Sequence, residues 1–452
     1  MTPNKLFGTD GIRGKANRYP MTPAMALVLG EAIASHFAKK KGKGRILIGK
    51  DTRRSSYMFE YALCAGISSM GSLAMLTGPI PTPAVAYLTQ TMRADAGVMI
   101  SASHNAYYDN GIKFFDSHGF KLNDEIERSM EDFVFATHDD SLRPINGDIG
   151  RAIRLDDASG RYVTYLKSTF PKELDLKGVK IVLDCAHGAG YKVAPLVLTE
   201  LGAEVKVIGA EPNGTNINEK CGALHPESMC EMVKKTKAHL GIAIDGDGDR
   251  LILCDEQGNL IDGDLVLALS ALERKREGKL AKDTVVGTVL SNMGLEVFLK
   301  ENGIQFLRTS VGDRFIVNEM RKGGYSLGGE PSGHLIFLDL STTGDGVLAA
   351  LQVLALMIQL GQPLSELSRV MSIYPQVSKN IPVTNRRDLD SIKGIQKEIK
   401  TVEKELHGKG RVIIRYSGTE PLLRVMVEGE NEDNLALYAD RLVNCISSHL
   451  RA

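Results

Sequence analysis

Residues 97–115 contain the first group of side chains that could carry out chemistry. A short apolar stretch at 97–100 is followed by small and polar residues that include Ser103 and His104, and Lys113 comes soon after. A buried strand that ends in this way delivers a reactive side chain to the rim of a fold. A hydroxyl, an imidazole and an ammonium so close together suit nucleophilic or phosphoryl chemistry. An ordinary polar loop after a strand explains this segment equally well on its own.

Residues 245–250, Asp-Gly-Asp-Gly-Asp-Arg, carry the strongest indication of a metal site. The carboxylates of Asp245, Asp247 and Asp249 would point to opposite faces of a strand and would scatter around a helix. The intervening glycines allow a tight curl that brings all three onto one hard cation. We expect Mg²⁺ in preference to Ca²⁺, because three carboxylates leave coordination positions for a phosphate oxygen. A solvated acidic turn is the alternative.

A calcium-binding EF-hand has a similar spacing, since the alternate carboxylates and Glu256 match several of its ligand positions. That interpretation fails at Arg250, where the calcium loop needs a glycine. It also fails at residues 251–253, an apolar run that is typical of a strand and has no flanking pair of helices.

Two other glycine-containing segments could bind a substrate. Residues 8–14 surround Arg13, and a loop of this kind lets backbone N–H groups and a guanidinium approach an anion. Residues 328–334 place Glu330 and Ser332 among glycines, and a carboxylate with a hydroxyl suits hydrogen bonding to vicinal sugar hydroxyls. An ordinary turn explains either segment on its own.

The segment 415–424 carries the groups of a phosphate-binding cradle. Guanidinium forks, hydroxyls and free backbone N–H groups all bind phosphate. These groups come from Arg415, Ser417, Gly418, Thr419 and Arg424. Thr419 could instead cap a turn. Together, the loops supply a serine nucleophile, a divalent cation site, a carboxylate that reads a diol and a phosphate clamp, which is a set that fits phosphoryl transfer on a sugar phosphate.

A repeated series of strands and helices must position the first three of these loops. Strand patterns begin near residues 45, 180 and 284, and each starts a strand–helix–strand–helix–strand series. The three series end just before Ser103, Asp245 and Glu330. This repetition predicts three similar α/β domains. Ligands gather beyond the carboxyl ends of strands in such sheets, so we expect the three loops to form one composite site.

The pattern changes after residue 375. Strands are predicted at 378–383, 411–416 and 423–428, and helices at 392–406 and 431–450, which is a small α+β domain joined by a linker. The predicted domains are therefore 1–152 with the serine loop, 153–255 with the metal loop, 256–372 with the sugar loop and 373–452 with the phosphate loop.

Composition excludes several classes of partner. The 452 residues have a formal net charge of zero, and no long basic stripe is present, so nucleic acid is not expected as a partner. The basic run 39–43 is short and typical of the solvated end of a helix. Residues 347–360 are apolar but too short to span a membrane, so they predict a buried helix. Six cysteines without a C-x-x-C pair indicate reduced thiols, and the polar residues 1–9 do not resemble a signal peptide, so we expect a cytoplasmic protein.

Over essentially its whole length, the sequence resembles the α-D-phosphohexomutase superfamily, with all four characteristic loops in order. The closest matching segments are residues 100–105, 109–115 and 212–218, together with Cys221-Gly222. The resemblance implies an α/β fold in which three similar mixed α/β domains and a C-terminal α+β domain surround a central cleft.

The resemblance also implies roles for the candidate residues. Ser103 would be phosphorylated in the active enzyme, and its phosphate would join Asp245, Asp247 and Asp249 in binding Mg²⁺. The candidates for proton transfer or for binding the transferred group are His104, Lys113, Arg13 and Arg250. The residues that would hold the sugar and the non-reacting phosphate are Glu330, Ser332, His334, Arg415, Ser417, Gly418, Thr419 and Arg424.

The reaction implied is the interconversion of glucosamine 6-phosphate and glucosamine 1-phosphate, toward UDP-N-acetylglucosamine and the cell wall. The partner would be a small sugar phosphate, with neither nucleic acid nor a membrane, and the protein would be a monomer or a homodimer. Pro331 stands where the branch of the superfamily that acts on glucosamine phosphates often has glutamine, which leaves the sugar preference open. The alternatives are a phosphoglucomutase or phosphomannomutase, a phosphatase, and a sugar-phosphate sensor without catalysis.

Overall fold

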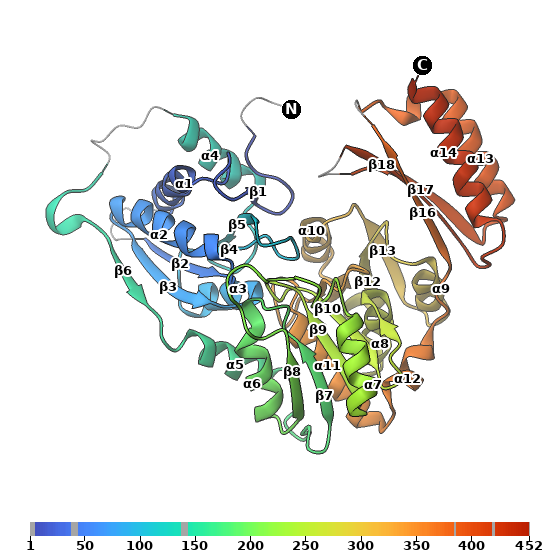
Figure 1. Ribbon diagram of the computed structural model, residues 1–452, viewed down its shortest axis with the longest axis horizontal. Coiled ribbons are helices and arrows are strands. Elements are labelled where there is room, and N and C mark those ends of the chain that lie inside the picture. Colours follow the sequence, from blue (N-terminus) through green and yellow to red (C-terminus); the bar gives the residue numbers. More distant parts are fainter. Residues whose placement is uncertain (1–4, 38–43, 137–142, 384–385, 418–420, 452) are drawn as a thin grey trace. The chain divides into compact units, whose positions relative to one another are not determined.

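The computed structural model describes residues 5–37, 44–136, 143–383, 386–417 and 421–451, and Figure 1 shows the course of the chain. These described residues form two compact units. The first comprises Met1–Thr288 and Gln305–Val370, and the second comprises Val289–Ile304 and Met371–Ala452. The first unit contains mixed sheets with packed helices, and the second contains an antiparallel sheet with packed helices, which confirms the predicted fold class of α/β domains with a C-terminal α+β domain. The basic run 39–43 lies outside the described residues, and the four predicted domain boundaries stay predictions.

The first sheet of the first unit places the serine loop. Its strands, in order across the sheet, are β1 (Ile12–Lys15), β5 (Asp109–Asp116), β4 (Ala96–Ile100), β2 (Arg45–Lys50), β3 (Leu73–Pro79) and β6 (Arg151–Arg154). Strand β2 pairs in parallel with β3 and β4, whereas β5 pairs antiparallel with β4. The helices of this region are α1 (Pro23–His36), α2 (Arg54–Ser69), α3 (Thr82–Thr91) and α4 (Asp124–Phe135).

Both faces of this sheet are covered, which is why its central strands are apolar throughout. On one face, Ile46 and Val98 share a buried cluster with residues of α1 and α2. On the other face α3 approaches so closely that a Cβ atom added to Gly97 would lie 2.1 Å from the Thr89 hydroxyl oxygen. A strand buried on both faces reads as a continuous hydrophobic run. Strand β4 is such a run, and it ends at the serine loop.

The remaining two sheets of the first unit repeat this plan. One contains β11 (Leu260–Ile261), β10 (Leu251–Asp255), β9 (Leu240–Ile244), β7 (Lys180–Asp184) and β8 (Glu204–Ile208). The other contains β13 (Gln305–Thr309), β12 (Thr284–Thr288), β14 (Leu327–Gly329) and β15 (Leu335–Phe337). The helices around them are α5 (Ala158–Ser168), α6 (Val193–Glu200), α7 (Glu227–Thr236), α8 (Gly263–Arg276), α10 (Asp313–Gly323), α11 (Gly346–Leu360) and α12 (Leu364–Leu367).

Each of the three sheets also contains a return strand that the sequence pattern predicted only in part. β4 pairs antiparallel with β5, β9 with β10, and β14 with β15. The three candidate loops are the connections within these hairpins. Because both ends of each loop are anchored in the sheet, its polar residues are held more firmly than in an open loop.

Helix α11 is the predicted buried helix, and its residues from Gly346 to Met357 are largely buried. Within the described part of the chain, no single helix has the length and apolar character needed to cross a membrane. Only the sequence of α11 taken together with Leu364–Val370 meets both requirements, and the chain bends by 97° between them.

The carboxyl group that begins α11 makes the stability of the protein depend on pH. Asp345 accepts hydrogen bonds from the backbone N–H of Leu348 at 3.0 Å and from the Tyr162 hydroxyl at 2.5 Å. Burial raises the pKa of Asp345 from 3.8 to about 6, against the effect of these hydrogen bonds. Between about pH 4 and pH 6, the folded state therefore keeps a proton on Asp345, whereas the unfolded state has lost it. The contribution of Asp345 to stability is full below pH 4 and falls by about 3 kcal/mol as the pH rises through 6.

We expect Asp345→Asn to remove this pH dependence. The measurement is the free energy of unfolding in urea at several pH values between 4.5 and 7, for the variant and the parent protein. Their difference should shift in favour of Asp345→Asn as the pH rises. The exposed Asp148 provides the control, since Asp148→Asn should keep a constant difference. A constant difference for Asp345→Asn as well would contradict the assignment.

The second unit contains the predicted α+β domain. Its sheet consists of β16 (Gln376–Pro382), β18 (Leu422–Gly429) and β17 (Gly410–Tyr416), all antiparallel. Helices α13 (Lys393–Glu405) and α14 (Leu435–Arg451) supply Ile395, Val402 and Leu442 to a core that also contains Val425 of β18. Helix α9 (Met293–Glu301) belongs to this unit too, because the backbone N–H of Met293 donates to the Glu428 carboxylate at 2.9 Å.

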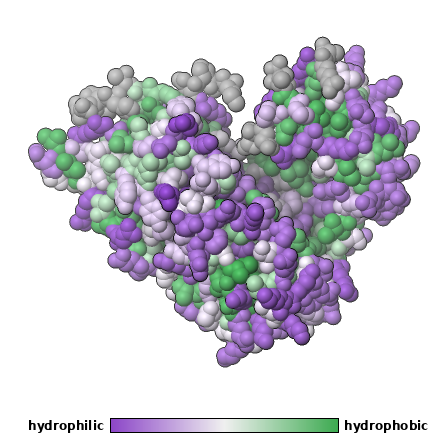
Figure 2. Space-filling model, in the orientation of Figure 1, coloured by the Kyte–Doolittle hydropathy of each residue, from purple (hydrophilic) through white to green (hydrophobic). Residues whose placement is uncertain are grey.

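Hydrophilic residues dominate the face of the molecule in Figure 2, and its apolar patches are separated from one another. Scattered apolar residues are normal on protein surfaces. The polar candidate loops must therefore be judged by their geometry, since polarity alone does not distinguish them.

Candidate functional site

The three acidic residues of the loop between β9 and β10 converge as predicted. Asp245, Asp247 and Asp249 are buried, and each offers one carboxylate oxygen within 4.8 Å of the others. Gly248 has a φ of +74°, which permits the tight curl. Oδ1 of Asp247 and Oδ1 of Asp249 are buried and accept no hydrogen bond from the residues that the structure describes. Buried carboxylate oxygens need a positive partner, so this donor set fits a hard divalent cation.

Ser103 lies directly beside these carboxylates. Its hydroxyl donates to Oδ2 of Asp245 at 2.5 Å, across the boundary between the first and second sheets. Ser103 has a φ of +50°, an uncommon conformation for a residue with a side chain, and its backbone N–H donates to the Ser101 hydroxyl at 2.9 Å. The loop therefore holds the Ser103 hydroxyl against the acidic cluster, as the composite-site prediction requires.

Two side chains that the sequence pattern did not reveal hold this strained loop. Arg53 donates to the carbonyl oxygens of Ser103 at 3.1 Å and Asn105 at 2.5 Å. Asn218 donates to the same two oxygens at 2.9 Å and 3.0 Å. Arg53 also pairs with Asp51, so its fork is fixed on both sides. Strain of this kind persists only where the surroundings over-determine it.

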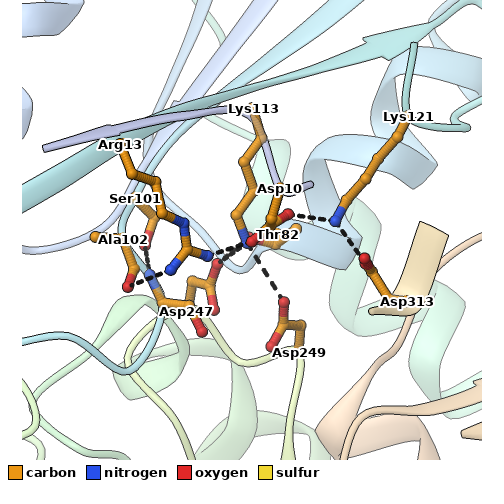
Figure 3. A network of polar contacts seen from close by, with 12 residues as sticks. Asp10, Arg13, Thr82, Ser101, Ala102, Lys113, Lys121, Asp247, Asp249 and Asp313 are labelled. Atoms are coloured by element: carbon orange, nitrogen blue, oxygen red, sulfur yellow. Dashed lines mark hydrogen bonds and ion pairs between the residues drawn. The ribbon is translucent and has the colours of Figure 1, made fainter. Parts of the chain in front are cut away.

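Lys113 supplies positive charge to the cluster. Its ammonium group is 2.9 Å from Oδ2 of Asp247, 3.5 Å from Oδ2 of Asp249 and 3.3 Å from Oδ2 of Asp10, and its side chain is 1% exposed (Figure 3). Burial acts to lower the pKa of Lys113, but Asp10, Asp247 and Asp249 raise it further than burial lowers it. Lys113 therefore stays protonated at neutral pH and can stabilise negative charge.

The other predicted catalytic candidates also lie around Ser103. His104 Nδ1 is 3.3 Å from the Ser103 hydroxyl oxygen, and burial, helped by Arg250, lowers the pKa of His104 to about 4. A neutral imidazole in this place can accept a proton. The backbone N–H of Arg250 donates to Asp245 at 3.2 Å, and Arg13 donates to the Ala102 carbonyl at 3.5 Å.

The predicted sugar loop joins the metal loop. Arg250 and His334 form a β-bridge, and the backbone N–H of Leu251 donates to the Gly333 carbonyl at 3.0 Å. The Glu330 carboxylate accepts from the backbone N–H of Gly312 at 3.0 Å, and Ser332 donates to it at 3.3 Å. Both side chains are only partly buried, which leaves them accessible to a ligand.

His334 lies deeper than the sequence pattern indicates. It is 3% exposed, and its Nε2 accepts from the backbone N–H of Gly344 at 3.2 Å. Its Nδ1 faces Oδ1 of Asp249 at 3.7 Å. We predicted contact between His334 and the substrate, whereas this placement favours an indirect role behind the metal loop.

Four further residues contact the site without having been predicted for it. The Thr82 hydroxyl donates to Oδ2 of Asp247 at 2.6 Å from the start of α3. Asp10 pairs with both Arg13 and Lys121, and Lys121 also lies 2.5 Å from Asp313. Asp10 stands in the glycine-rich loop that drew attention to Arg13, so a signal for it existed. For Thr82, Lys121 and Asp313 no local pattern indicated a partner.

The predicted phosphate cradle lies in the second unit. Arg415 of β17 and Arg424 of β18 are directly opposite each other in the sheet. The backbone N–H of Ser417 donates to the Leu422 carbonyl at 2.8 Å, and the Ser417 carbonyl accepts from Arg386 at 2.6 Å. Gly418 and Thr419 lie outside the described residues.

Four family models match the chain in sequence. They describe the α/β/α domains I, II and III of phosphoglucomutase/phosphomannomutase, at residues 4–140, 160–258 and 262–374, and its C-terminal domain, at residues 379–444. The matches follow one another along the chain in the order of the candidate loops.

Whole-chain comparisons agree with the domain models. A phosphoglucosamine mutase of Syntrophotalea carbinolica is 56% identical over 447 residues, which cover 99% of this chain and 98% of the relative. A phosphoglucomutase/phosphomannomutase family protein of Burkholderia thailandensis has the same fold, with a TM-score of 0.80 over 98% of this chain and 97% of that one at 21% identity. An Aspergillus fumigatus N-acetylphosphoglucosamine mutase, solved in complex with GlcNAc-6P and magnesium, has a TM-score of 0.68 at 17% identity, and covers 99% of this chain and 97% of its own. The chain therefore belongs to the phosphoglucomutase/phosphomannomutase family of phosphohexomutase enzymes.

Proposed function

We propose that this enzyme is a phosphoglucosamine mutase, which interconverts glucosamine 6-phosphate and glucosamine 1-phosphate and so feeds UDP-N-acetylglucosamine synthesis in the cytoplasm. The observation that carries the proposal is the hydroxyl of Ser103, 2.5 Å from Asp245 in a buried group of three carboxylates. The full-length similarity to phosphoglucosamine mutases supports the choice of sugar.

The carboxylates of Asp245, Asp247 and Asp249 would hold Mg²⁺, which supplies positive charge against the charge of the transferring phosphoryl group. Mg²⁺ prefers oxygen ligands and keeps positions for phosphate oxygens, and this cluster offers carboxylate oxygens only. Lys113 and Arg250, whose pKa values are raised by the neighbouring carboxylates against the effect of burial, add permanent positive charge around the same atoms.

Ser103 would carry the phosphoryl group between turnovers. In the first step the P–O bond to Ser103 Oγ breaks, and a new P–O bond forms to the free hydroxyl of the sugar monophosphate, whose proton passes to a base. The neutral His104 is the nearest candidate for this base. The resulting bisphosphate reorients, and Ser103 Oγ then takes the other phosphoryl group, while the sugar oxygen that leaves regains a proton.

The two remaining loops would hold the sugar phosphate during these steps. Glu330 and Ser332 would hydrogen-bond to sugar hydroxyls. Both side chains are accessible, and the Ser332 hydroxyl lies beside the Glu330 carboxylate, so the two could contact neighbouring hydroxyls of one sugar. Arg415 and Arg424 would bind the phosphate that does not react, because guanidinium groups bind phosphate and the two residues lie opposite each other in the sheet.

A comparison of three substrates tests the proposal. The purified enzyme is given the 6-phosphates of glucosamine, glucose and mannose with Mg²⁺, and formation of each 1-phosphate and release of inorganic phosphate are followed. We expect the highest kcat/KM with glucosamine 6-phosphate and no net phosphate release. A higher kcat/KM with glucose or mannose 6-phosphate would favour a phosphoglucomutase or phosphomannomutase. Net phosphate release would favour a phosphatase, and binding without turnover would favour a sensor.

A further inference from the structure

A ring of neighbouring polar side chains lies along one edge of the acidic cluster. Within the ring, three carboxylates alternate with two ammonium groups and one imidazole. Its members, in order, are Asp249, Lys113, Asp10, Lys121, Asp313 and His334. Figure 3 shows Lys121 between the carboxylates of Asp10 and Asp313, and Lys113 between Asp10 and Asp249. The links through Lys113 and Lys121 are ion pairs, so a change at one of their members is passed to the next.

The ring holds Asp249 from both sides. Lys113 Nζ is 3.5 Å from its Oδ2, and His334 Nδ1 is 3.7 Å from its Oδ1. The backbone N–H of Gly344 donates to His334 Nε2 at 3.2 Å, so this nitrogen lies beside Asp313 without donating a hydrogen bond to it. Groups that orient the ligands of a metal site affect its affinity as well as its shape.

Lys121 and Asp313 form the far side of the ring, away from the acidic cluster. Lys121 contacts Asp10 and lies 2.5 Å from Asp313, and their side chains are 16% and 13% exposed. Asp313 lies 3.6 Å from His334 Nε2. Loss of the Lys121 ammonium would leave Asp10 and Asp313 without the cation between them, and Asp10 would then compete with Asp249 for Lys113.

A second set of contacts joins the same elements without entering the ring. Arg314, the neighbour of Asp313 on α10, lies 2.8 Å from Asp124 and 3.1 Å from Glu127. It also donates to the Leu122 carbonyl at 2.7 Å. These contacts of Arg314 hold α10 against the N-terminal sheet region without using any residue of the ring. The effect of losing them can therefore be measured separately from the effect of changing the ring.

We propose that Lys121 and Asp313 are positioning residues of the cation site: Asp313 fixes Lys121 and Lys121 fixes Asp10, which in turn holds Lys113 beside Asp249 in the orientation that binds a divalent cation. Neither residue touches the acidic triplet, so both act through other side chains. The inference rests on the proposed function only for its effect on turnover. Its effect on cation binding stands on the contacts alone.

The test measures binding of Mn²⁺, a divalent cation that can be followed by electron paramagnetic resonance, to the full-length protein. The variants are Lys121→Met and Asp313→Asn. Each should weaken Mn²⁺ binding by about tenfold. Each should also lower kcat for glucosamine 6-phosphate and leave KM nearly unchanged, because the sugar-binding groups are not in the ring. The double variant should lose no more affinity than the worse single variant, since both substitutions break one chain of contacts.

The matched control is Asp124→Asn, which weakens the attachment of α10 but leaves the ring intact. Asp124 is 69% exposed, and this variant should keep the Mn²⁺ affinity, kcat and KM of the parent protein. Lys121→Arg keeps the positive charge and should retain more Mn²⁺ affinity than Lys121→Met, and it serves as the second variant if Lys121→Met does not fold.

Unchanged Mn²⁺ affinity in Asp313→Asn, or an equal loss in Asp124→Asn, would overturn the positioning role. Failure of the proposed function looks different. In that case the parent protein would bind Mn²⁺ without converting glucosamine 6-phosphate, and the comparison of affinities among the variants would still decide the role of the ring.

Discussion

Replacement of Ser103 by alanine is expected to abolish mutase turnover, with kcat falling by about 10,000-fold or more. The Ser103 hydroxyl is the group that lies 2.5 Å from Asp245, and no phosphoenzyme forms at this position without its oxygen atom. The rate is measured with glucosamine 6-phosphate and Mg²⁺. Intact-mass measurement of the purified protein gives an independent readout, because the added phosphate of the parent protein should be missing from Ser103→Ala.

Ser101 provides the matched control for this substitution. Its hydroxyl accepts from the backbone N–H of Ser103 at 2.9 Å, so it shapes the same loop without carrying the phosphoryl group. We expect Ser101→Ala to lower kcat by about 10- to 100-fold, as a small displacement of a reacting group would, and to remain phosphorylated. Near-normal turnover in Ser103→Ala would refute the phosphoserine mechanism. Equal losses in the two variants would instead indicate that the loop matters through its shape.

The comparison of Ser103 with its supports shows what a sequence pattern can reveal. An apolar run that ends in small polar residues reports a buried strand and the loop after it, and β4 followed by Ser103 has this form. Alternate aspartates with glycines report a curl, because few other conformations use those residue types together. Both signals are local, whereas the prediction that the Ser103 loop and the acidic triplet belong to one site came from the repeated strand–helix series that ends at each loop.

The supports of the site are invisible to the same reasoning. Arg53 and Asn218 hold the carbonyl oxygens of Ser103 and Asn105, yet they lie 50 and 115 positions from Ser103 in sequence, and neither carries a local signal of this contact. Lys121 and Asp313 are 192 positions apart and meet only after three sheets have formed. A single sequence carries no periodicity that pairs such residues, since their contact is a consequence of how the sheets pack.

The return strands stand between these two cases. Residues 251–253 were predicted as a strand because they are continuously apolar, and they form part of β10. β5 was not predicted, because Asp109, Asn110 and Lys113 interrupt its apolar residues. Asn110 and Lys113 are buried and bonded in the site or in its support, so they obscured the strand pattern for a functional reason.

Lys113→Met is expected to cause the largest loss of stability among single substitutions near the site. Methionine preserves the length of the side chain but removes the ammonium group that lies between Asp10, Asp247 and Asp249. A buried ion pair that loses one partner typically destabilises a protein by about 3–5 kcal/mol. We expect a loss of this size without divalent cation, measured as the free energy of unfolding in urea, together with loss of turnover.

Added Mg²⁺ distinguishes the loss of positive charge in Lys113→Met from a loss of side-chain packing. If the acidic cluster binds a divalent cation, saturating Mg²⁺ should restore a larger share of stability to Lys113→Met than it adds to the parent protein, because the cation replaces part of the missing positive charge. Turnover should stay low, since Mg²⁺ is already present in the assay and cannot take the place of the Lys113 ammonium beside the transferring phosphoryl group. A deficit that Mg²⁺ leaves unchanged would instead assign the effect of Lys113 to packing.

The double variant Lys113→Met/Asp247→Asn completes this argument. Asp247 is the closest of the partners of Lys113 in the acidic triplet, at 2.9 Å, so removing its charge as well should relieve the repulsion that the first substitution exposes. We expect the double variant to be more stable than Lys113→Met alone in the absence of Mg²⁺, and to gain little from added Mg²⁺ because a cation ligand is gone. Strictly additive losses of stability would mean that Lys113 and Asp247 act independently, and the charge balance described for this site would then be wrong.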